Sequence, residues 1–285
     1  MALVVAAGAC WTSRALAQEP TPDAANGAAP PAPIGLSGGL SNSFVLRGNG
    51  AESTLMTVLS ASYAWTSSFS TFARVGSVYN ASTGLESAAG WANPALGASV
   101  LFPVTKSLSI GGLSGVTIPV GSGGGNSPSP AALRAWTNSI DWGGAMFAVN
   151  HVDIFAGVHA QYSLDRLTLQ FDSTLHELLR VRGQETDPIG AAATVTGTTA
   201  TVSYAVLPQL SFSTALSETR VWNTPTYVVV DPNSRVDYFF SAGVSTDVKI
   251  GRTDVTPGLV YARALDLPLS GQGFQVAELD LGFSL

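Results

Sequence analysis

From residue 34 onward, hydrophobic and polar residues alternate along the chain with a period of two. Within residues 55–65, the odd positions include Leu, Tyr and Trp, whereas the even positions include Thr, Ser and Ala. Residues 96–104 and 108–120 show the same alternation, with Gly, Ser and Thr on the less hydrophobic face. Successive side chains of a β-strand point to opposite faces of the sheet. The pattern therefore predicts strands with one apolar face and one face of small or polar residues.

Twelve such strands are predicted, joined alternately by short turns and longer connections. An even number of strands places both termini of the chain on the side of the short turns, which is the periplasmic side. Residues 142–163 are interpreted as one long strand, because dividing them at Asn150–His151 would give thirteen strands and break the alternation of short and long connections. The predicted strands cover residues 34–46, 53–65, 68–79, 95–104, 107–120, 142–163, 166–181, 192–206, 210–221, 236–249, 254–265 and 274–285.

Composition decides which kind of β protein this is. Only 11% of the 285 residues are charged, whereas ordinary soluble domains carry roughly 25%. A soluble β-sandwich would have a charged solvent face, but here the less hydrophobic face is small and polar. Beyond the first few positions there is no apolar run of about 18 residues, as a membrane helix requires. The closed barrel is the other structure that satisfies its backbone in lipid. The predicted fold is an all-β, transmembrane, antiparallel up-and-down β-barrel of about 12 strands, surrounded by lipid in the bacterial outer membrane.

The N-terminal region has a different composition. Residues 1–17 are predicted to be a signal peptide, because small residues at Ala15 and Ala17 precede Gln18 in the form of a signal-peptidase site. A lipoprotein signal ending at Cys10 is the alternative. Residues 18–33 are rich in Ala and Pro without periodicity, and we expect a flexible periplasmic leader. Residues 34–285 then form the barrel.

The final strand predicts how the barrel is assembled. In residues 275–285, Ala, Leu and Phe occupy the odd positions from 277 onward, and charged or small residues occupy most of the even ones. This resembles the C-terminal strand by which the barrel-assembly machinery recognises outer-membrane proteins. The usual last residue is aromatic, whereas this chain ends in Leu285 and carries its aromatic residue at Phe283.

The same alternation assigns charged side chains to the barrel lumen. If Leu164 and Asp165 form a two-residue turn, Asp153 lies opposite His176, His151 is diagonal to His176, and His159 lies opposite Gln170. The functional interpretation of the resulting cluster of His151, Asp153 and His176 is a contact for a solute or a metal. The alternative is a polar wall in which Asp153 pairs with a histidine. The full predicted lumen set is Arg74, His151, Asp153, His159, Asp172, His176, Arg180, Asp237, Asp247, Asp254, Glu278 and Asp280.

The sequence favours a protein that is not an enzyme and carries no cofactor or metal. A lipid hydrolase of the outer membrane needs a serine beside a histidine base on the lipid-accessible face, whereas the three histidines fall on the predicted lumen face. The glycine-rich run at 121–125 lacks the following Lys-Ser/Thr of a phosphate loop. A net charge of −6 argues against nucleic acid as a partner.

Residues 34–285 resemble the outer-membrane transporter-like family called "MetA pathway of phenol degradation". The resemblance lies in segments such as Leu-Gly-Ala-Ser-Val at 96–100, Phe-Pro-Val-Thr at 102–105 and Asp-Leu-Gly-Phe at 280–283. It implies uptake of small solutes, including small aromatic or hydrophobic compounds. We therefore expect a channel for passive diffusion of small solutes. The alternatives are a structural or adhesion barrel with a blocked lumen and, less favoured, an outer-membrane lipid hydrolase.

Overall fold

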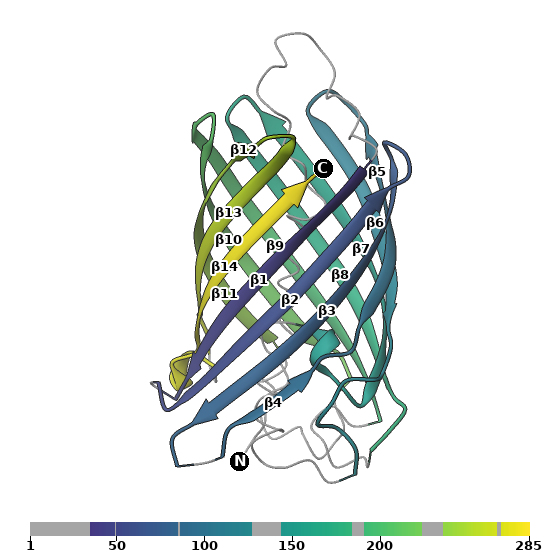
Figure 1. Ribbon diagram of the computed structural model, residues 1–285, viewed down its shortest axis with the longest axis vertical. Coiled ribbons are helices and arrows are strands. Elements are labelled where there is room, and N and C mark those ends of the chain that lie inside the picture. The colour runs from purple at the N-terminus through teal and green to yellow at the C-terminus, as the bar shows by residue number, and fades with distance from the viewer. Residues whose placement is uncertain are drawn as a thin grey trace.

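The protein is a closed antiparallel barrel of twelve strands, as the sequence predicted (Figure 1). The computed structural model describes residues 35–48, 50–84, 86–126, 144–183, 191–223, 236–266 and 269–285. The predicted signal peptide and leader, and with them Cys10, lie outside these ranges. Neighbouring strands pair in chain order, and the last strand pairs with the first to close the wall. The strands are β1 (Gly35–Arg47), β2 (Glu52–Ala64), β3 (Phe69–Ser82), β5 (Ala95–Pro103), β6 (Leu108–Thr117), β7 (His151–Leu164), β8 (Leu167–Arg180), β9 (Ala192–Leu207), β10 (Leu210–Val221), β11 (Val236–Thr246) continued by β12 (Val248–Ile250), β13 (Thr253–Ala264) and β14 (Gln275–Ser284).

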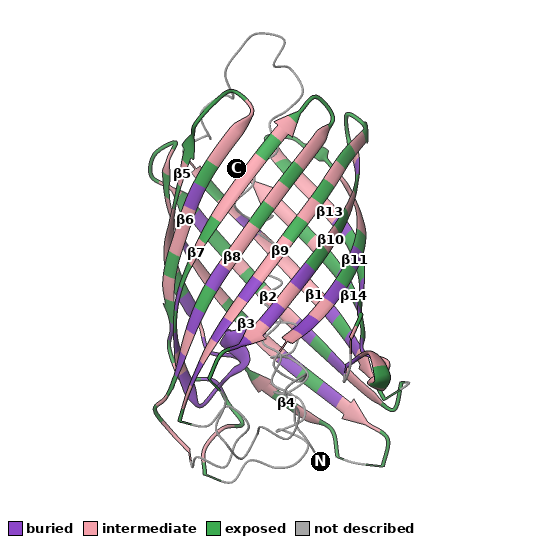
Figure 2. Cartoon of the chain, turned by 180° about the vertical axis from the view of Figure 1, so that it is seen from behind, coloured by how far each residue is buried: buried purple, intermediate pink, exposed green. Residues whose placement is uncertain are grey.

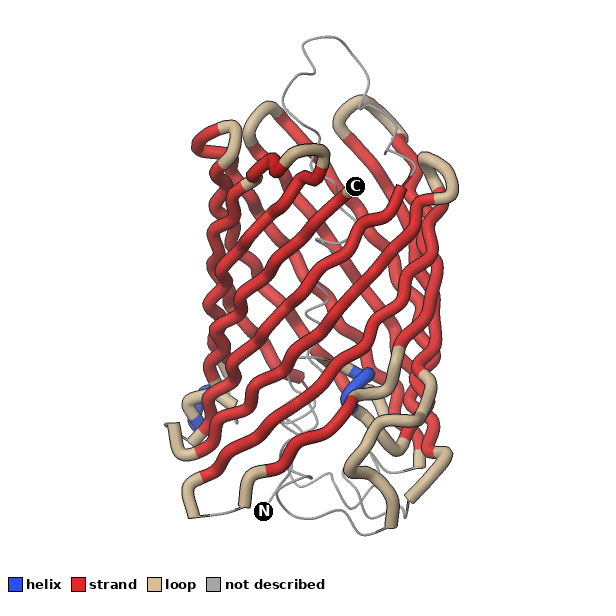
Figure 3. Tube along the Cα trace, viewed as in Figure 1, coloured by secondary structure: helices blue, strands red, loops and turns tan. Residues whose placement is uncertain are grey.

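A short additional strand lies outside this closed ring. The strand β4 (Ala88–Trp91) pairs only with β3, within the connection that leads to β5. This connection belongs to the end of the barrel where the longer connections gather, whereas the short turns and the C-terminus lie at the opposite end (Figures 1 and 3).

The interruption between β11 and β12 has a local cause in Pro257. Ser245 pairs with Gly258 on one side of the interruption, and Val248 pairs with Val255 on the other. Proline has no N–H with which to complete the ladder between these pairs. Asp247 instead accepts a hydrogen bond from the Thr256 hydroxyl, at 2.7 Å. The two segments thus make one position in the wall, which keeps the number of barrel strands at twelve.

The outer face of the barrel is apolar. Large hydrophobic side chains at alternate positions are exposed, among them Leu59, Phe171, Leu216 and Leu279. Figure 2 shows this as exposed and covered residues following one another along each strand. Transmembrane barrels present such an apolar band to lipid. Among the described residues, no helix is both long and apolar enough to cross a membrane.

The prediction of one strand over residues 142–163 is wrong. The strand β7 begins at His151, and the residues before it form a turn of 3₁₀ helix, η2 (Ala145–Phe147). In one continuous strand, Met146 and Ala148 would share a face with the exposed Ile154, whereas both are buried. The chain bends at Gly144, where φ is 81°, a value that favours glycine. Residues 142–143 lie outside the described ranges.

The turn between β7 and β8 also differs from the prediction. Leu164 pairs with Leu167, so that Asp165 and Arg166 form the turn instead of Leu164 and Asp165. Asp165 adopts φ 51°, and aspartate is one of the few residues other than glycine that tolerates this region. The observed register is displaced by two residues from the predicted one.

Candidate functional site

The interior of the barrel near the long connections is apolar. Buried side chains from most strands of the wall form one hydrophobic cluster with residues of the loops. We call the members of this cluster on the wall and in the β13–β14 connection the apolar ring. Figure 2 shows the buried residues concentrated toward this end. The ring lies inside the barrel at the end where the longer connections gather. Its larger members on the wall and in the β13–β14 connection are Val45, Met56, Val78, Leu178, Val195, Val221, Phe239, Leu269, Phe274 and Val276.

Residues 144–150 fold against the apolar ring and are called the inward segment. Phe147 is completely buried and Met146 nearly so. The wall accommodates them through small residues, because a Cβ at Gly76 would lie 3.1 Å from the terminal methyl of Met146. The inward segment therefore adds its own apolar side chains to the same buried cluster.

Asn93, a buried residue just before β5, holds the inward segment in place. Its Nδ2 donates hydrogen bonds to the carbonyl oxygens of Ala148 and His151, each at 3.0 Å. Its Oδ1 accepts a hydrogen bond from the Gly121 backbone amide at 2.9 Å. The backbone amide of Asn93 donates to the Met146 carbonyl oxygen at 2.9 Å. One side chain thus connects three stretches of chain at this end of the barrel.

Arg182 binds the inward segment from the other side. Its Nε and Nη2 donate to the Val149 carbonyl at 3.0 and 2.7 Å, and Nη2 also donates to the Gly121 carbonyl. Sequence reasoning selected neither Asn93 nor Arg182. The Asn93–Pro94 dipeptide indicates only a turn, and nothing local in the sequence points to partners more than 25 residues away.

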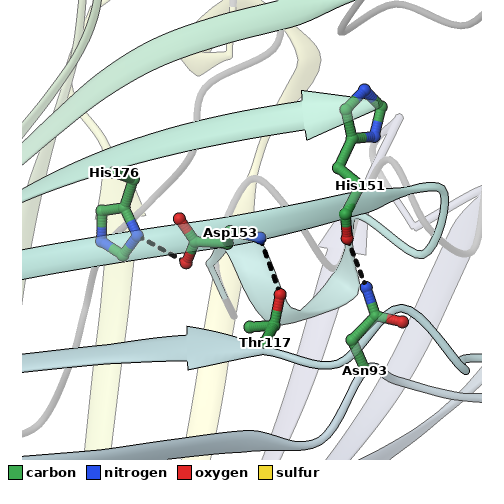
Figure 4. A network of polar contacts seen from close by, with 5 residues as sticks. All are labelled: Asn93, Thr117, His151, Asp153 and His176. Carbon is green, nitrogen blue, oxygen red and sulfur yellow. Dashed lines mark hydrogen bonds and ion pairs between the residues drawn. The ribbon is translucent and has the colours of Figure 1, made fainter. Parts of the chain in front are cut away.

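The predicted contact between Asp153 and His176 is present and fully buried. Asp153 Oδ2 lies 2.9 Å from His176 Nδ1, and the two side chains are 0% and 1% exposed (Figure 4). The predicted direct pairing is wrong, because Asp153 lies opposite Leu178 and His176 lies opposite Phe155. The contact is diagonal, as the register displaced by two residues requires.

His151 does not join the Asp153–His176 pair. It lies opposite Arg180, and Figure 4 shows its ring away from the other two side chains. The backbone amide of Asp153 donates a hydrogen bond to the Thr117 hydroxyl at 2.9 Å. At such burial the pair is out of reach of solutes, which favours the polar-wall interpretation over a solute or metal contact.

A row of rings connects this pair to the neighbouring strands. Phe155 lies 5.7 Å from the His176 ring and 6.3 Å from the Phe72 ring, measured between centroids. The wall beneath Phe155 requires glycine at position 115, because a Cβ there would lie 2.3 Å from the Phe155 ring. The Arg74 guanidinium lies 5.4 Å from the Phe72 centroid at the far end of the row. This part of the inner wall is closely packed.

A second titratable pair lies farther toward the short turns and is partly exposed. His159 lies directly opposite Asp172, not opposite Gln170 as predicted. Its Nδ1 is 2.7 Å from Asp172 Oδ1, and the side chains are 15% and 17% exposed. Gln170 donates to Asp172 Oδ2 at 2.8 Å, and Gln161 lies directly opposite Gln170. These four residues, His159, Gln161, Gln170 and Asp172, are called the polar patch.

The remaining predicted lumen residues are distributed around the barrel. Glu278 is buried and accepts a hydrogen bond from Ser43 at 2.5 Å. Asp237 is buried as well, whereas Arg74, Arg180 and Asp280 are half-buried. Asp247 and Asp254 are exposed near the short turns, and Asp254 lies 4.0 Å from Lys249. Within the described part of the chain, no three His, Cys, Asp or Glu side chains are grouped as a metal site would need.

Comparison with known proteins finds relatives by structure only. No family model and no curated protein sequence matches the chain. Its structure is similar to the COG4313 outer membrane channel from Pseudomonas putida F1, with a TM-score of 0.62 and 12% identity over 89% of this chain and 96% of that one. It is also similar to the KdgM porin, with a TM-score of 0.50 and 9% identity over 87% and 99% of the two chains, and to the NanC porin, with a TM-score of 0.50 and 11% identity over 86% and 98%. At these identities the likeness shows the fold. With its apolar outer face and closed wall, the chain has the fold of a transmembrane β-barrel, as these outer-membrane channels do.

Proposed function

We propose that the protein is a channel for passive diffusion of small solutes across the outer membrane. The observation that carries this proposal is the inner face between the apolar ring and the short turns. Hydroxyl groups meet there across neighbouring strands, as in Ser37 with Ser62 and Ser70 with Ser99, both at 2.7 Å. A barrel of twelve strands has a backbone radius of about 12 Å, from a strand spacing of about 4.8 Å and a tilt of about 40°. Small polar side chains on such a wall favour a narrow water path.

The apolar ring supports selection of solutes with an apolar body. An ion or a strongly hydrated solute loses hydration where Phe147, Leu178 and Phe239 form the wall, and this loss is costly without polar partners. A small aromatic or hydrophobic compound loses little there. This is the class of solute implied by the resemblance to the phenol-degradation family, and we propose it for this channel. The proposal includes no catalytic step.

One observation favours the alternative of a barrel with a blocked lumen. The apolar ring and Phe147 are almost completely buried, as they would be if the interior at this level were permanently filled. A structural or adhesion protein would then act through its long connections. The two functions differ in whether small molecules cross a membrane that contains the protein.

Planar bilayers and swelling of proteoliposomes distinguish the two functions. We expect small current steps from the purified protein, and faster swelling than protein-free vesicles in small neutral solutes. Phe147→Ala should increase the current, because it removes a ring from the constriction. Phe240→Ala is the matched control, since Phe240 is 43% exposed on the outer face. Absence of current and of solute flux in both wild type and Phe147→Ala would refute the channel and favour the blocked barrel.

We also propose that the barrel-assembly machinery recognises β14. Leu279 and Leu281 are exposed on its outer face, and the strand pairs along ten positions with β1 to close the barrel. An assembly assay in which Phe283→Ala is inserted as efficiently as wild type would argue against a contribution of this aromatic residue.

A further inference from the structure

The polar patch contains two hydrogen-bond acceptors that no residue of the described chain uses. His159 makes its one hydrogen bond through Nδ1, to Asp172. Gln161 makes its one hydrogen bond through Nε2, to Ser163 at 3.3 Å. His159 Nε2 and Gln161 Oε1 thus have no partner among the described residues. Both side chains are on the inner face and partly exposed.

Asp172 determines which nitrogen of the His159 ring carries the proton. A carboxylate only accepts hydrogen bonds, so the ring nitrogen that faces it must carry the proton. In the neutral imidazole, Nε2 is then an acceptor. Gln170 occupies the second oxygen of Asp172, which keeps the carboxylate fixed. The arrangement is the one by which an outer carboxylate orients a histidine for a contact on its other side.

The strands on either side of His159 and Asp172 place small or uncharged residues beside the polar patch. Gly111 lies opposite His159 on β6, and it cannot be replaced by a larger residue without strain, because its Cβ would lie 2.5 Å from the Val100 carbonyl oxygen. On the other side, Thr199 and Thr201 of β9 lie opposite Asp172 and Gln170. Hydroxyl and amide groups therefore continue across the wall without a charged side chain from β6 or β9.

We propose that the polar patch is a binding site for a neutral solute with two hydroxyl groups. His159 and Gln161 are two residues apart on one strand, so their side chains start about 6.6 Å apart along the wall. Acceptors on two side chains that start at this spacing can each take a hydroxyl donor from one small ring. A carboxylate would find no unpaired cation in the patch, and Asp172 already accepts two hydrogen bonds, which disfavours an ammonium group. This site deepens the proposed channel function by giving the lumen a contact for solutes.

The test uses the three histidines of the protein as separate reporters. Protein with ¹³C-labelled histidine in detergent micelles is titrated with trans-1,4-cyclohexanediol, whose hydroxyl oxygens are roughly 6 Å apart, close to the in-strand spacing of about 6.6 Å. We expect a saturable shift of the His159 ring signal, assigned through His159→Gln. The signals of His151 and His176 should stay in place, because both side chains are 1% exposed. They also report whether each variant is folded.

Two controls make the result specific. The dimethyl ether of the same diol has the same ring but no donors, and it should leave the His159 signal unchanged. Gln161→Leu should weaken diol binding by about threefold to tenfold, the effect of one hydrogen bond. Gln209→Leu, in the exposed turn between β9 and β10, should bind as wild type does.

The proposal is overturned if the ether shifts His159 as the diol does, if no shift saturates, or if Gln161→Leu binds with unchanged affinity. These outcomes are independent of the test of the proposed channel function. A saturable diol shift in a protein that carries no current would support the site and refute the channel. Current without a diol shift would do the reverse.

Discussion

Replacing Asn93 with alanine should loosen the inward segment and destabilise the barrel. The side chain is completely buried and makes three hydrogen bonds, two to the carbonyls of Ala148 and His151 and one from the Gly121 amide. Each contributes about 1 kcal/mol net, and a buried group left without a partner costs about 1–3 kcal/mol. We expect Asn93→Ala to lower the free energy of unfolding by about 3–5 kcal/mol. Urea titration in detergent, followed by tryptophan fluorescence, measures this change.

Asn42→Ala is the matched control for this experiment. Asn42 is a half-buried amide on the wall, and its side chain accepts one hydrogen bond, from Thr57 at 2.8 Å. Its loss should cost about 1 kcal/mol. Asn93→Ala should also increase the current in planar bilayers, because the inward segment is no longer held against the apolar ring. If Asn93→Ala is no less stable than Asn42→Ala and its current equals that of wild type, Asn93 does not hold the segment.

Two further substitutions test the packing of the inner wall. Gly115→Ala should destabilise the barrel or lower its yield on refolding, because its Cβ would lie 2.3 Å from Phe155 and 2.4 Å from the Leu96 carbonyl oxygen. Gly282→Ala should be tolerated, since the nearest neighbour of its Cβ would be 3.7 Å away. Equal gel mobility shifts on heating for both variants would contradict this. His176→Ala should cost about 3–5 kcal/mol because it leaves the buried Asp153 carboxylate without its partner, and the double variant with Asp153→Ala should recover part of this loss in the same urea titration. A double variant less stable than His176→Ala would show that the pair does not act in this way.

The sequence by itself determined the class of fold and the two-sided character of its strands. Alternation with a period of two, together with few charges and a small polar face, has one stable arrangement in lipid, the closed barrel. A register error of one residue would exchange the two faces of a strand. The actual error at the β7–β8 turn is two residues, and a displacement by two keeps each side chain on its predicted face. For this reason the error changed the partners predicted for His159, Asp172 and His176 but not the strand face on which they were predicted.

Tertiary structure decided which residues pair across β7 and β8 and where the inward segment lies. The turn at Asp165–Arg166 brings His159 opposite Asp172, and a choice between two adjacent two-residue turns depends on the packing of the whole hairpin. The apolar residues at 146 and 148 suit a lipid-facing strand as well as a buried segment, because both environments exclude water. Hydrogen bonds from Asn93 and Arg182, which are far away in the sequence, select the buried arrangement. Such long-range contacts leave no periodic signal in the sequence, so the inward segment could be found only in the folded barrel.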